Sequence, residues 1–352
     1  MSTKDIQREI DAHLAILRKL RTPSGLFLAA AEAGVSTGYD KSWLRDNFYE
    51  VLALEELGEW EESAQTWHAL LDIFLKHESK INWAINERPR FTYQYIHARY
   101  NPETFEEFWE EWGNKQNDAV GCILFALGDR ALKGHSAVRD DNDKRIVGRL
   151  VNYLNTIEYW HDPDNGVWEE YEEVHASSIG ACVAGLQKVD EAGLADVPRD
   201  LISKGYDALH ALLPRESHTK FADLAQLSLM YPYDLLTKEE EDIILSNIEY
   251  HLSKDKGVVR YKTDRYYNAN EDGWSEEAEW TMGFSWLSII YRKRGEHDKA
   301  DHWLEMARQT CDKDGKLPEL YFSHTDAPNE NNPLGWSESL YVIALQQLLR
   351  GT

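Results

Sequence analysis

Helical periodicity runs through almost the whole chain, and it restricts the possible folds more than any other feature of the sequence. Apolar residues recur at the spacing that places them on one face of a helix, and convincing strand patterns are few. Segments 90–98 and 257–268 are interpreted as short strands or extended loops. The pattern predicts an all-α fold with about twelve helices, near residues 3–21, 45–58, 60–77, 116–131, 139–157, 174–191, 199–212, 219–230, 237–251, 276–294, 296–311 and 335–350.

The helix ends carry recognisable boundary signals. Thr237 precedes the acidic run KEEE, which is typical of a capped N-terminus. Gly58 and Gly295 end helices before the short turns LGEWEES and RGEHDKA, and each turn joins an apolar helix to a helix that carries a Trp. Twelve helices paired as six hairpins can close into a ring. We therefore predict an (α/α)6 toroid, a six-hairpin barrel in which the loops at one rim form a cleft.

The chain has no low-complexity or Pro/Gly/Ser-rich linker, so we expect a single domain over residues 1–352. The N-terminus lacks the apolar segment of a signal peptide, and no apolar run approaches transmembrane length. The three cysteines lie in apolar helical contexts and are expected to be buried free thiols, namely Cys122, Cys182 and Cys311. With no Asn-x-Ser/Thr sequon present, these features favour a cytoplasmic location.

Charge and aromatic content restrict the kind of ligand. The formal net charge of −24 should repel nucleic acid and anionic membranes, but it leaves a neutral ligand unaffected. The 13 Trp and 18 Tyr residues exceed what a core usually needs, and flat rings stack well on the apolar faces of sugars. The composition therefore favours a neutral carbohydrate as ligand.

The residues that can carry chemistry gather in the connections between helices. Each of these connections combines Trp or Tyr with Arg, Asp, Glu or an amide, as functional loops often do. They are YDKSWLRDNFY (39–49), EEWGNKQNDAVG (110–121), NGVWEEYEE (165–173), VVRYKTDRYYN (258–268), and KLPELYFSH (316–324) leading to NNPLGWSES (331–339).

These stretches resemble glycoside hydrolase family 15, the glucoamylases, in the same order along the chain. SWLRDN resembles the family's Trp-x-Arg-Asp signature, and WGNKQNDA resembles its Trp-Gly-x-x-Gln-x-Asp segment. GVWEE resembles the Trp-Glu-Glu that carries the catalytic acid, and RYKTDRYYN resembles the family's Arg-Tyr segment. LPELY and LGWSES resemble the segment of the catalytic base and the helix after it. Each motif is weak alone, but five in register indicate the family and imply its toroidal fold.

The resemblance implies two catalytic carboxyl groups. Inverting glycosidases hold a general acid and a general base about 6.5–9.5 Å apart and need no metal or cofactor. Glu169 matches the acid, and an adjacent indole and neighbouring carboxylates would raise its pKa as a general acid requires. Glu172 is the alternative in a shifted register, because EEVHASS (172–178) resembles the segment of fungal glucoamylases that follows the acid. An acidic helix start is a third reading of this segment. Glu319 matches the base.

The remaining motif residues are expected to bind sugar. Arg45 and Asp46 would hold hydroxyls of the terminal glucose, although an ion pair that caps the next helix is the alternative. Glu170 would bind the leaving-group sugar. The other expected contacts are aromatic walls and further polar groups of the same pocket, namely Tyr39, Trp43, Trp112, Gln116, Asp118, Trp168, Arg260, Asp264 and Trp336. Trp336 is equally compatible with a place in the core.

Parts of the chain look more like the N-terminal halves of the phosphorylase kinase α and β subunits, for example SGLFLAA, HASSIG, ALLPRES and LPELYFS. We therefore expect a compact branch of the family, without an N-terminal β-sandwich or a C-terminal starch-binding module. The implied activity is exo-acting α-glucosidase on small α-gluco-oligosaccharides of the maltose or isomaltose type. A catalytically silent glycan sensor and a trehalase-type hydrolase are the alternatives. Asn117 stands where fungal glucoamylases have Arg, so linkage and chain length stay open, as does the oligomeric state.

Overall fold

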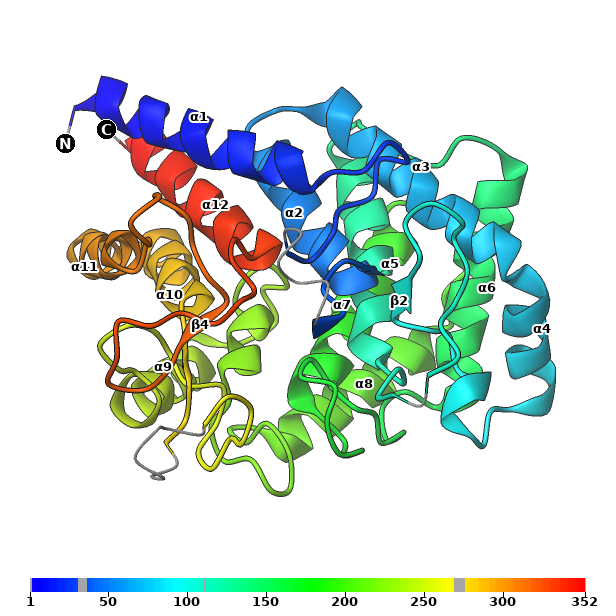
Figure 1. Cartoon of the computed structure of the whole chain (residues 1–352). Helices are drawn as coiled ribbons and strands as arrows, with labels where there is room; N and C mark the ends of the chain where they lie inside the picture. The colour runs from blue at the N-terminus through cyan, green and yellow to red at the C-terminus, as the bar shows by residue number, and fades with distance from the viewer. Residues whose placement is uncertain (1, 31–36, 111, 269–275, 352) are drawn as a thin grey trace.

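The computed structural model describes residues 2–30, 37–110, 112–268 and 276–351 (Figure 1). Within these residues, six elements form an inner ring in which each element contacts the next, and the last of them contacts the first. The ring consists of α2 (Leu44–Glu56), α5 (Asn117–Leu132), α7 (Ala176–Glu191), η3 (Leu224–Leu229), α10 (Met282–Lys293) and α12 (Gly335–Gly351).

Six further helices alternate with the inner elements along the chain and pack around them. The chain's first and last helices lie side by side, α1 in blue and α12 in red (Figure 1). The outer helices are α1 (Thr3–Leu20), α3 (Trp60–Lys76), α6 (Asp141–Ile157), α8 (Arg199–Leu212), α9 (Lys238–His251) and α11 (His297–Gln309). The predicted all-α (α/α)6 toroid is therefore confirmed.

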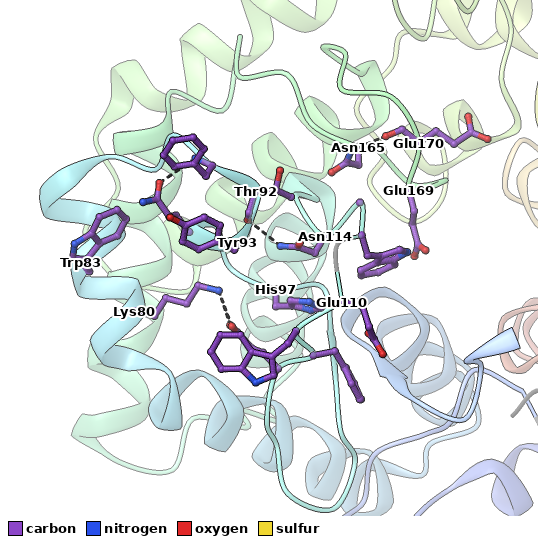
Figure 2. A pocket seen from close by; sticks show the side chains of 17 residues that line it. Lys80, Trp83, Thr92, Tyr93, His97, Glu110, Asn114, Asn165, Glu169 and Glu170 are labelled. Atoms are coloured by element: carbon purple, nitrogen blue, oxygen red, sulfur yellow. Dashed lines mark hydrogen bonds and ion pairs between the residues drawn. The ribbon is translucent and has the colours of Figure 1, made fainter. Parts of the chain in front are cut away.

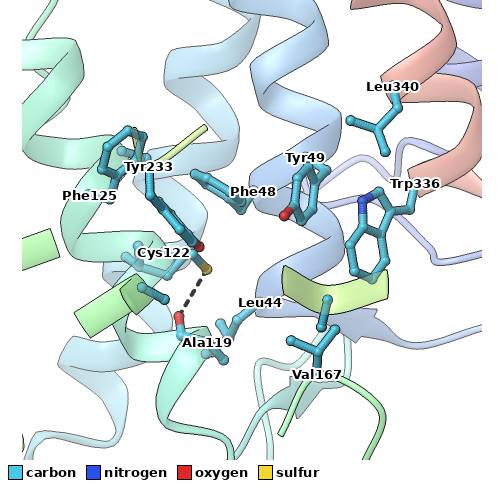
Figure 3. Packing of buried hydrophobic residues seen from close by; sticks show 14 of the residues in the cluster. Leu44, Phe48, Tyr49, Ala119, Cys122, Phe125, Val167, Tyr233, Trp336 and Leu340 are labelled. Carbon is cyan, nitrogen blue, oxygen red and sulfur yellow. Dashed lines mark hydrogen bonds between the residues drawn. The ribbon is translucent and has the colours of Figure 1, made fainter. Parts of the chain in front are cut away.

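Hydrophobic patterning explains which helices lie inside. In α1 the buried residues recur every three or four positions, as in an amphipathic helix with one solvated face. In α5 every residue from Asn117 to Gly128 is buried, because this helix is surrounded by others. Figure 3 shows the centre of the ring, where Tyr49 of α2 stacks on Trp336 of α12 with ring centroids 4.5 Å apart. This aromatic core lies directly beneath the residues of the candidate site.

Two short antiparallel ribbons tie the loops of one rim together. β1 (Ser42–Trp43) pairs with β2 (Arg99–Tyr100), and β3 (Glu279–Trp280) pairs with β4 (Leu320–Tyr321). The first ribbon links the segment before α2 to the long connection that leads to α5. The second links the segment before α10 to the segment before α12. The ribbons thus fix the loops that carry Trp43 and Glu319.

Three local predictions differ from the structure. The inner element expected as a helix over 219–230 is only a 3-10 segment, η3 (Leu224–Leu229), since Asp223 caps it tightly and a proline, Pro232, follows. The helix expected from residue 276 begins at Met282, because β3 occupies the preceding residues. An additional helix, α4 (Glu78–Glu87), packs against α6 and α3 and was not predicted.

The two segments of uncertain type are mostly irregular. Residues 90–98 contain the 3-10 turn η2 (Thr92–Gln94), and 257–268 form isolated bridges rather than a strand. All three cysteines are free; Cys122 and Cys182 are buried and Cys311 is half-buried. Among the helices of the described residues, none is both long and apolar enough to cross a membrane.

Candidate active site

A cavity of about 290 Å³ lies at the rim where the inner elements begin. Its lining comes from the loop before α2 and the first turn of that helix, from the connections before α5 and α7, and from the segments before α10 and α12. Of the fourteen predicted site residues, eleven line this cavity, namely Tyr39, Trp43, Arg45, Asp46, Trp112, Trp168, Glu169, Glu170, Arg260, Glu319 and Trp336.

Glu169 lies in the loop before α7, with its backbone in the left-handed region at φ 62°. Its Oε1 accepts a hydrogen bond from the indole Nε1 of Trp43 at 2.7 Å, and Nη2 of Arg45 lies 3.4 Å from the same oxygen. Burial raises the pKa of this carboxyl to about 7, against the opposing effects of the Arg45 charge and the Trp43 hydrogen bond. Burial therefore favours the protonated form of Glu169.

Glu172, the alternative in the shifted register, lies elsewhere. Its carboxylate is half-exposed, faces Nζ of Lys115 at 3.4 Å, and does not line the cavity. The turn Asp164–Glu173, closed by paired backbone hydrogen bonds of 2.8 and 3.0 Å, directs Glu169 toward the cavity and leaves Glu172 outside. The structure thus brings Glu169, and not Glu172, to the cavity.

Glu319 lies just before β4 and is almost fully buried. Its Oε1 accepts a hydrogen bond from the Tyr39 hydroxyl at 2.6 Å, and its Oε2 accepts from the side-chain amides of Asn331, at 2.8 Å, and Asn329. Burial raises the pKa of this carboxyl above its ordinary value, and the three donors oppose that rise because they favour the ionised form. These fixed donors orient the carboxylate at the cavity wall.

Arg45 connects the cavity to polar residues behind it. Its Nη1 donates to Asp118 at 2.8 Å and to Gln116 at 2.9 Å. Neither of these two residues lines the cavity, although both were expected to do so. They are buried at the start of α5 and hold the guanidinium in place instead. Asp46, the next residue of α2, does line the cavity, and burial raises its pKa to about 6.

Arg260 is held in a similar way. Its Nε and Nη2 donate to the two oxygens of Asp264, each at 2.7 Å, which is the bidentate geometry of an Arg–carboxylate pair. Asp264 lies behind Arg260 and does not line the cavity, in contrast to the expectation of a sugar contact. Nη2 of Arg260 also donates to Glu170 at 2.9 Å, so this guanidinium joins the acid-bearing loop to the segment 258–268.

The aromatic residues form a nearly continuous wall. Trp43 lies 5.4 Å from Tyr39 and 6.0 Å from Trp112, measured between ring centroids. Trp168 lies 6.1 Å from Trp336 in a stacked arrangement, and its indole Nε1 donates to Asp223 at 2.7 Å. Since Trp336 also stacks on Tyr49, this residue belongs to both the core and the cavity wall.

Sequence reasoning missed two of the three residues that donate to Glu319, whereas the third, Tyr39, was expected at the site. Asn329 and Asn331 lie ten and twelve residues after Glu319 and return to it through a tight loop. Tyr266, in the motif RYKTDRYYN, also lines the cavity, with its hydroxyl 3.2 Å from that of Tyr39, and the motif alone does not predict this contact. The sequence feature that could have indicated the two asparagines is the amide-rich run that follows the LPELY motif.

Comparison with known proteins connects this geometry to a family. The family model described as glycosyl hydrolases family 15 matches residues 7–243. The skeletal muscle isoform of phosphorylase b kinase regulatory subunit alpha from Oryctolagus cuniculus is 25% identical over 378 residues, which cover 87% of this chain and 30% of that subunit. An uncharacterized glycosyl hydrolase from Methanocaldococcus jannaschii is 25% identical over 353 residues, which cover 87% of this chain and 50% of that protein.

Among solved structures, a glycosidase variant in complex with glucose superposes with a TM-score of 0.82 at 18% identity. The match covers 98% of this chain and 97% of that chain. The chain therefore shares its fold with a glycosidase of nearly the same length, whereas it spans half or less of the two curated relatives.

Proposed function

Because the chain belongs to glycosyl hydrolase family 15, we propose that it is an inverting, exo-acting α-glucosidase. It releases β-glucose from the non-reducing ends of short α-glucosides of the maltose or isomaltose type. The observation that carries this proposal is that Glu169 and Glu319, from separate loops, line one cavity in different environments. Glycosidases require two such carboxyl groups, and inversion is the course that the family resemblance implies.

In the proposed reaction Glu169 is the general acid. The glycosidic oxygen gains the proton of its carboxyl group as the bond to the anomeric carbon breaks. A pKa of about 7 suits this role, because the group still holds its proton near neutral pH and is acidic enough to release it. The hydrogen bond from Trp43 then stabilises the carboxylate that remains.

Glu319 is the general base. Its carboxylate takes a proton from a water molecule that attacks the anomeric carbon from the opposite face, so that the product is β-glucose. Tyr39, Asn329 and Asn331 keep the carboxylate oriented. Arg45 and Asp46 bind hydroxyls of the terminal glucose against the aromatic wall, and Glu170 and Arg260 meet the leaving sugar. Gln116, Asp118 and Asp264 act as positioning residues for the two arginines.

A second candidate function is a glycan sensor that binds sugar in the same cavity without turnover. It is favoured by the likeness to phosphorylase b kinase regulatory subunits. A trehalase-type hydrolase is a third candidate. We retain a small neutral α-gluco-oligosaccharide as the ligand, since a net charge of −24 disfavours nucleic acid and anionic membranes. A cytoplasmic location remains a prediction from the sequence.

The first test is glucose release from maltose, isomaltose, maltotriose and trehalose, with the anomer followed by NMR in the first minutes. We expect β-glucose from α-1,4- or α-1,6-linked substrates. Glu169→Gln and Glu319→Gln should each lower kcat by about a hundredfold or more, because each removes a proton-transfer group. Trp fluorescence on sugar binding would check that both variants still bind.

Glu172→Gln is the matched control, since it makes the same change three residues from Glu169 but outside the cavity. Its activity should stay close to that of the unaltered enzyme. Initial α-glucose would contradict the inverting mechanism. Sugar binding without release from any substrate would favour the sensor, and release from trehalose alone would favour the trehalase-type reaction.

A further inference from the structure

The turn Asp164–Glu173, which carries Glu169, rests on a buried histidine that the proposed reaction does not use. His175 directly precedes α7 and is 4% exposed. A Cβ added to Gly166 would lie 2.8 Å from both Cδ2 and Nε2 of the His175 ring, so the ring packs against the backbone of the turn. The imidazole therefore forms the floor under this part of the turn.

Gly166 in turn fixes the backbone of Glu169. Its φ of 63° is in the left-handed region, and its carbonyl oxygen accepts a hydrogen bond from the Glu169 N–H at 3.3 Å. The side-chain amide of Asn165 donates to the carbonyl of Glu170 at 2.6 Å. Figure 2 shows Asn165 beside Glu170 in this turn, with the carboxyl groups of Glu169 and Glu170 pointing in different directions. Contacts thus connect the His175 ring, through Gly166, to the backbone that directs Glu169.

The His175 ring lies among charged groups of two segments. Its Nδ1 faces Oε1 of Glu216, in the connection between α8 and η3, at 3.5 Å. The charges of Asp164, Glu173 and Lys220 also act on the ring. Burial opposes protonation of His175, but Glu216 and Asp164 outweigh it and raise the pKa of the imidazole to about 9. At neutral pH the ring is therefore a cation that pairs with Glu216.

Glu216 is itself held in place by the start of α7. Its Oε1 accepts a hydrogen bond from the Ser177 hydroxyl at 2.6 Å, and its Oε2 accepts from the Ser177 N–H at 3.2 Å. The carbonyl of Glu216 accepts from the Ala176 N–H at 2.7 Å. A carboxylate is favourable at this end of a helix, because the free N–H groups and the helix dipole are positive there. The ring of His175 is thus fixed between an anchored carboxylate and the turn.

We propose that His175 is a positioning residue for the general acid: its charged ring supports Gly166 and thereby holds the Glu169 carboxyl inside the cavity. The proposal rests on the proposed function, because it takes Glu169 as the acid. Inside the cavity, beside Trp43 and Arg45, burial raises the pKa of Glu169 to about 7. Without the ring beneath it the turn relaxes toward α7, the carboxyl group moves into water, and its pKa falls toward the ordinary value of about 4.3.

The first test is the pH profile of kcat/KM for His175→Asn. Asparagine keeps a donor for Glu216 but removes the ring and its charge. We expect kcat/KM to fall by about tenfold to a hundredfold, because the acid is misplaced. We also expect the alkaline limb to move to lower pH. Loss of a positive charge alone would raise the pKa of Glu169 and move the limb to higher pH, so an unchanged or raised limb overturns the proposal.

His13→Asn is the matched control. His13 is also 4% exposed, and its Nδ1 pairs with another buried glutamate, Glu338, but it does not line the cavity. The substitution should lower stability as His175→Asn does, without moving the alkaline limb. An equal shift of the limb in the two variants would show a general effect of losing a buried histidine and would overturn the positioning role.

A second pair of variants tests the same contact from the side of the turn. Gly166→Ala places a Cβ against the His175 ring, whereas Gly193→Ala adds one at the same φ of 63° with no atom within 4 Å. Both therefore carry the same backbone strain, but only Gly166→Ala disturbs the contact. We expect the alkaline limb to move to lower pH in Gly166→Ala and to stay in place in Gly193→Ala. A limb that stays in place in Gly166→Ala would contradict the proposal.

Direct titration of Glu169 separates this proposal from the proposed function. The chain is labelled with ¹³C at the Glu carboxyl carbons, and the NMR signal of Glu169 is identified as the one absent from Glu169→Gln. A lower pKa of Glu169 in His175→Asn than in the unaltered chain supports the positioning role even if the chain cleaves no sugar. An equal pKa in the two overturns the role even if the unaltered chain is an active glucosidase.

Discussion

Trp43 connects the aromatic wall of the cavity to the carboxyl group that we assign as the acid. Its indole N–H donates to Oε1 of Glu169, and a hydrogen bond of this kind favours the ionised carboxylate. It therefore lowers the pKa of Glu169, which burial raises to about 7. Burial, the charges of Arg45, Asp46 and Arg99, and this hydrogen bond together set the pH above which the acid no longer holds its proton.

We predict that Trp43→Phe moves the alkaline limb of the pH profile of kcat/KM to higher pH. Phenylalanine keeps an aromatic wall but removes the N–H donor, so the pKa of Glu169 should rise further. The acid then remains protonated, and the enzyme active, over a wider alkaline range. Measuring kcat/KM between about pH 5 and pH 9 gives the position of the limb.

Trp168→Phe is the matched control for this prediction. Trp168 also lines the cavity, but its indole N–H donates to Asp223 and not to Glu169. The substitution should therefore lower activity without moving the alkaline limb. An unchanged limb in Trp43→Phe, or equal shifts in both variants, would argue against Glu169 as the group that titrates there.

At the residue level, sequence motifs located the cavity lining better than the contacts behind it. A motif such as Trp-x-Arg-Asp predicts that an arginine lies at the site. It does not show which neighbouring residues line the cavity with the arginine and which lie behind it. Gln116, Asp118 and Asp264 were consequently expected at the cavity, whereas each holds a guanidinium from behind. Asn329 and Asn331 were missed because the amide-rich run that contains them does not show that the loop folds back onto Glu319.

Helices α5 and α7 approach each other closely because of glycine. A Cβ at Gly185 would lie 2.4 Å from the carbonyl oxygen of Gly121, and a Cβ at Gly121 would lie 2.5 Å from the backbone of Ala181. Both contacts are with backbone atoms that cannot move aside. Gln116 directly precedes α5, and the acid-bearing loop precedes α7. The packing of the two helices therefore also sets the distance between Gln116 and the acid-bearing loop.

We predict that Gly185→Ala destabilises the protein by about 1–3 kcal/mol, the usual cost of overpacking a core. Gly148→Ala is the control within another helix, α6, where the nearest atom to an added Cβ is 3.9 Å away. That change should be neutral or stabilise by up to about 1 kcal/mol, because alanine is the better helix former. Urea unfolding of both variants measures the difference, and equal stabilities would refute a close-packed pair.

Most elements could be predicted from periodicity alone, and the exceptions have physical reasons. The helix expected over 219–230 carries the right apolar spacing, but tertiary contacts confine it to a short 3-10 segment between Asp223 and Pro232. α4 was missed because Glu78–Glu87 has few buried apolar residues, only Ile81 and Ala84. Its amphipathic signal is therefore weak. Periodicity does not encode which helices contact one another. The prediction of a closed ring therefore depends on the number of hairpins and on the family resemblance.

In the folded molecule as a whole, burial raises the pKa values of several carboxyl groups. Burial raises the pKa to about 6 for Asp46 and Asp223, and to about 7 for Asp164 and Glu169. In the unfolded chain these groups release their protons near pH 4. Between about pH 4 and pH 7 these four groups bind more protons in the folded state than in the unfolded chain, which lowers the free energy of unfolding as pH rises. Burial also lowers the pKa of His97 to about 3, which has the opposite effect, but one histidine acts against four carboxyl groups.

We accordingly predict a higher urea midpoint at about pH 5.5 than at about pH 7.5. Repulsion within a chain of net charge −24 would act in the same direction, so the comparison is repeated in about 1 M NaCl. At that ionic strength repulsion between exposed charges is screened, whereas the proton balance of buried groups persists. A pH dependence that survives in salt identifies buried titratable groups as its source. These are the carboxyl groups together with His175, whose pKa the Glu216 hydrogen bond raises to about 9 against the effect of burial. A dependence that disappears in salt would assign it to surface charge, and a lower midpoint at pH 5.5 would contradict the raised pKa values themselves.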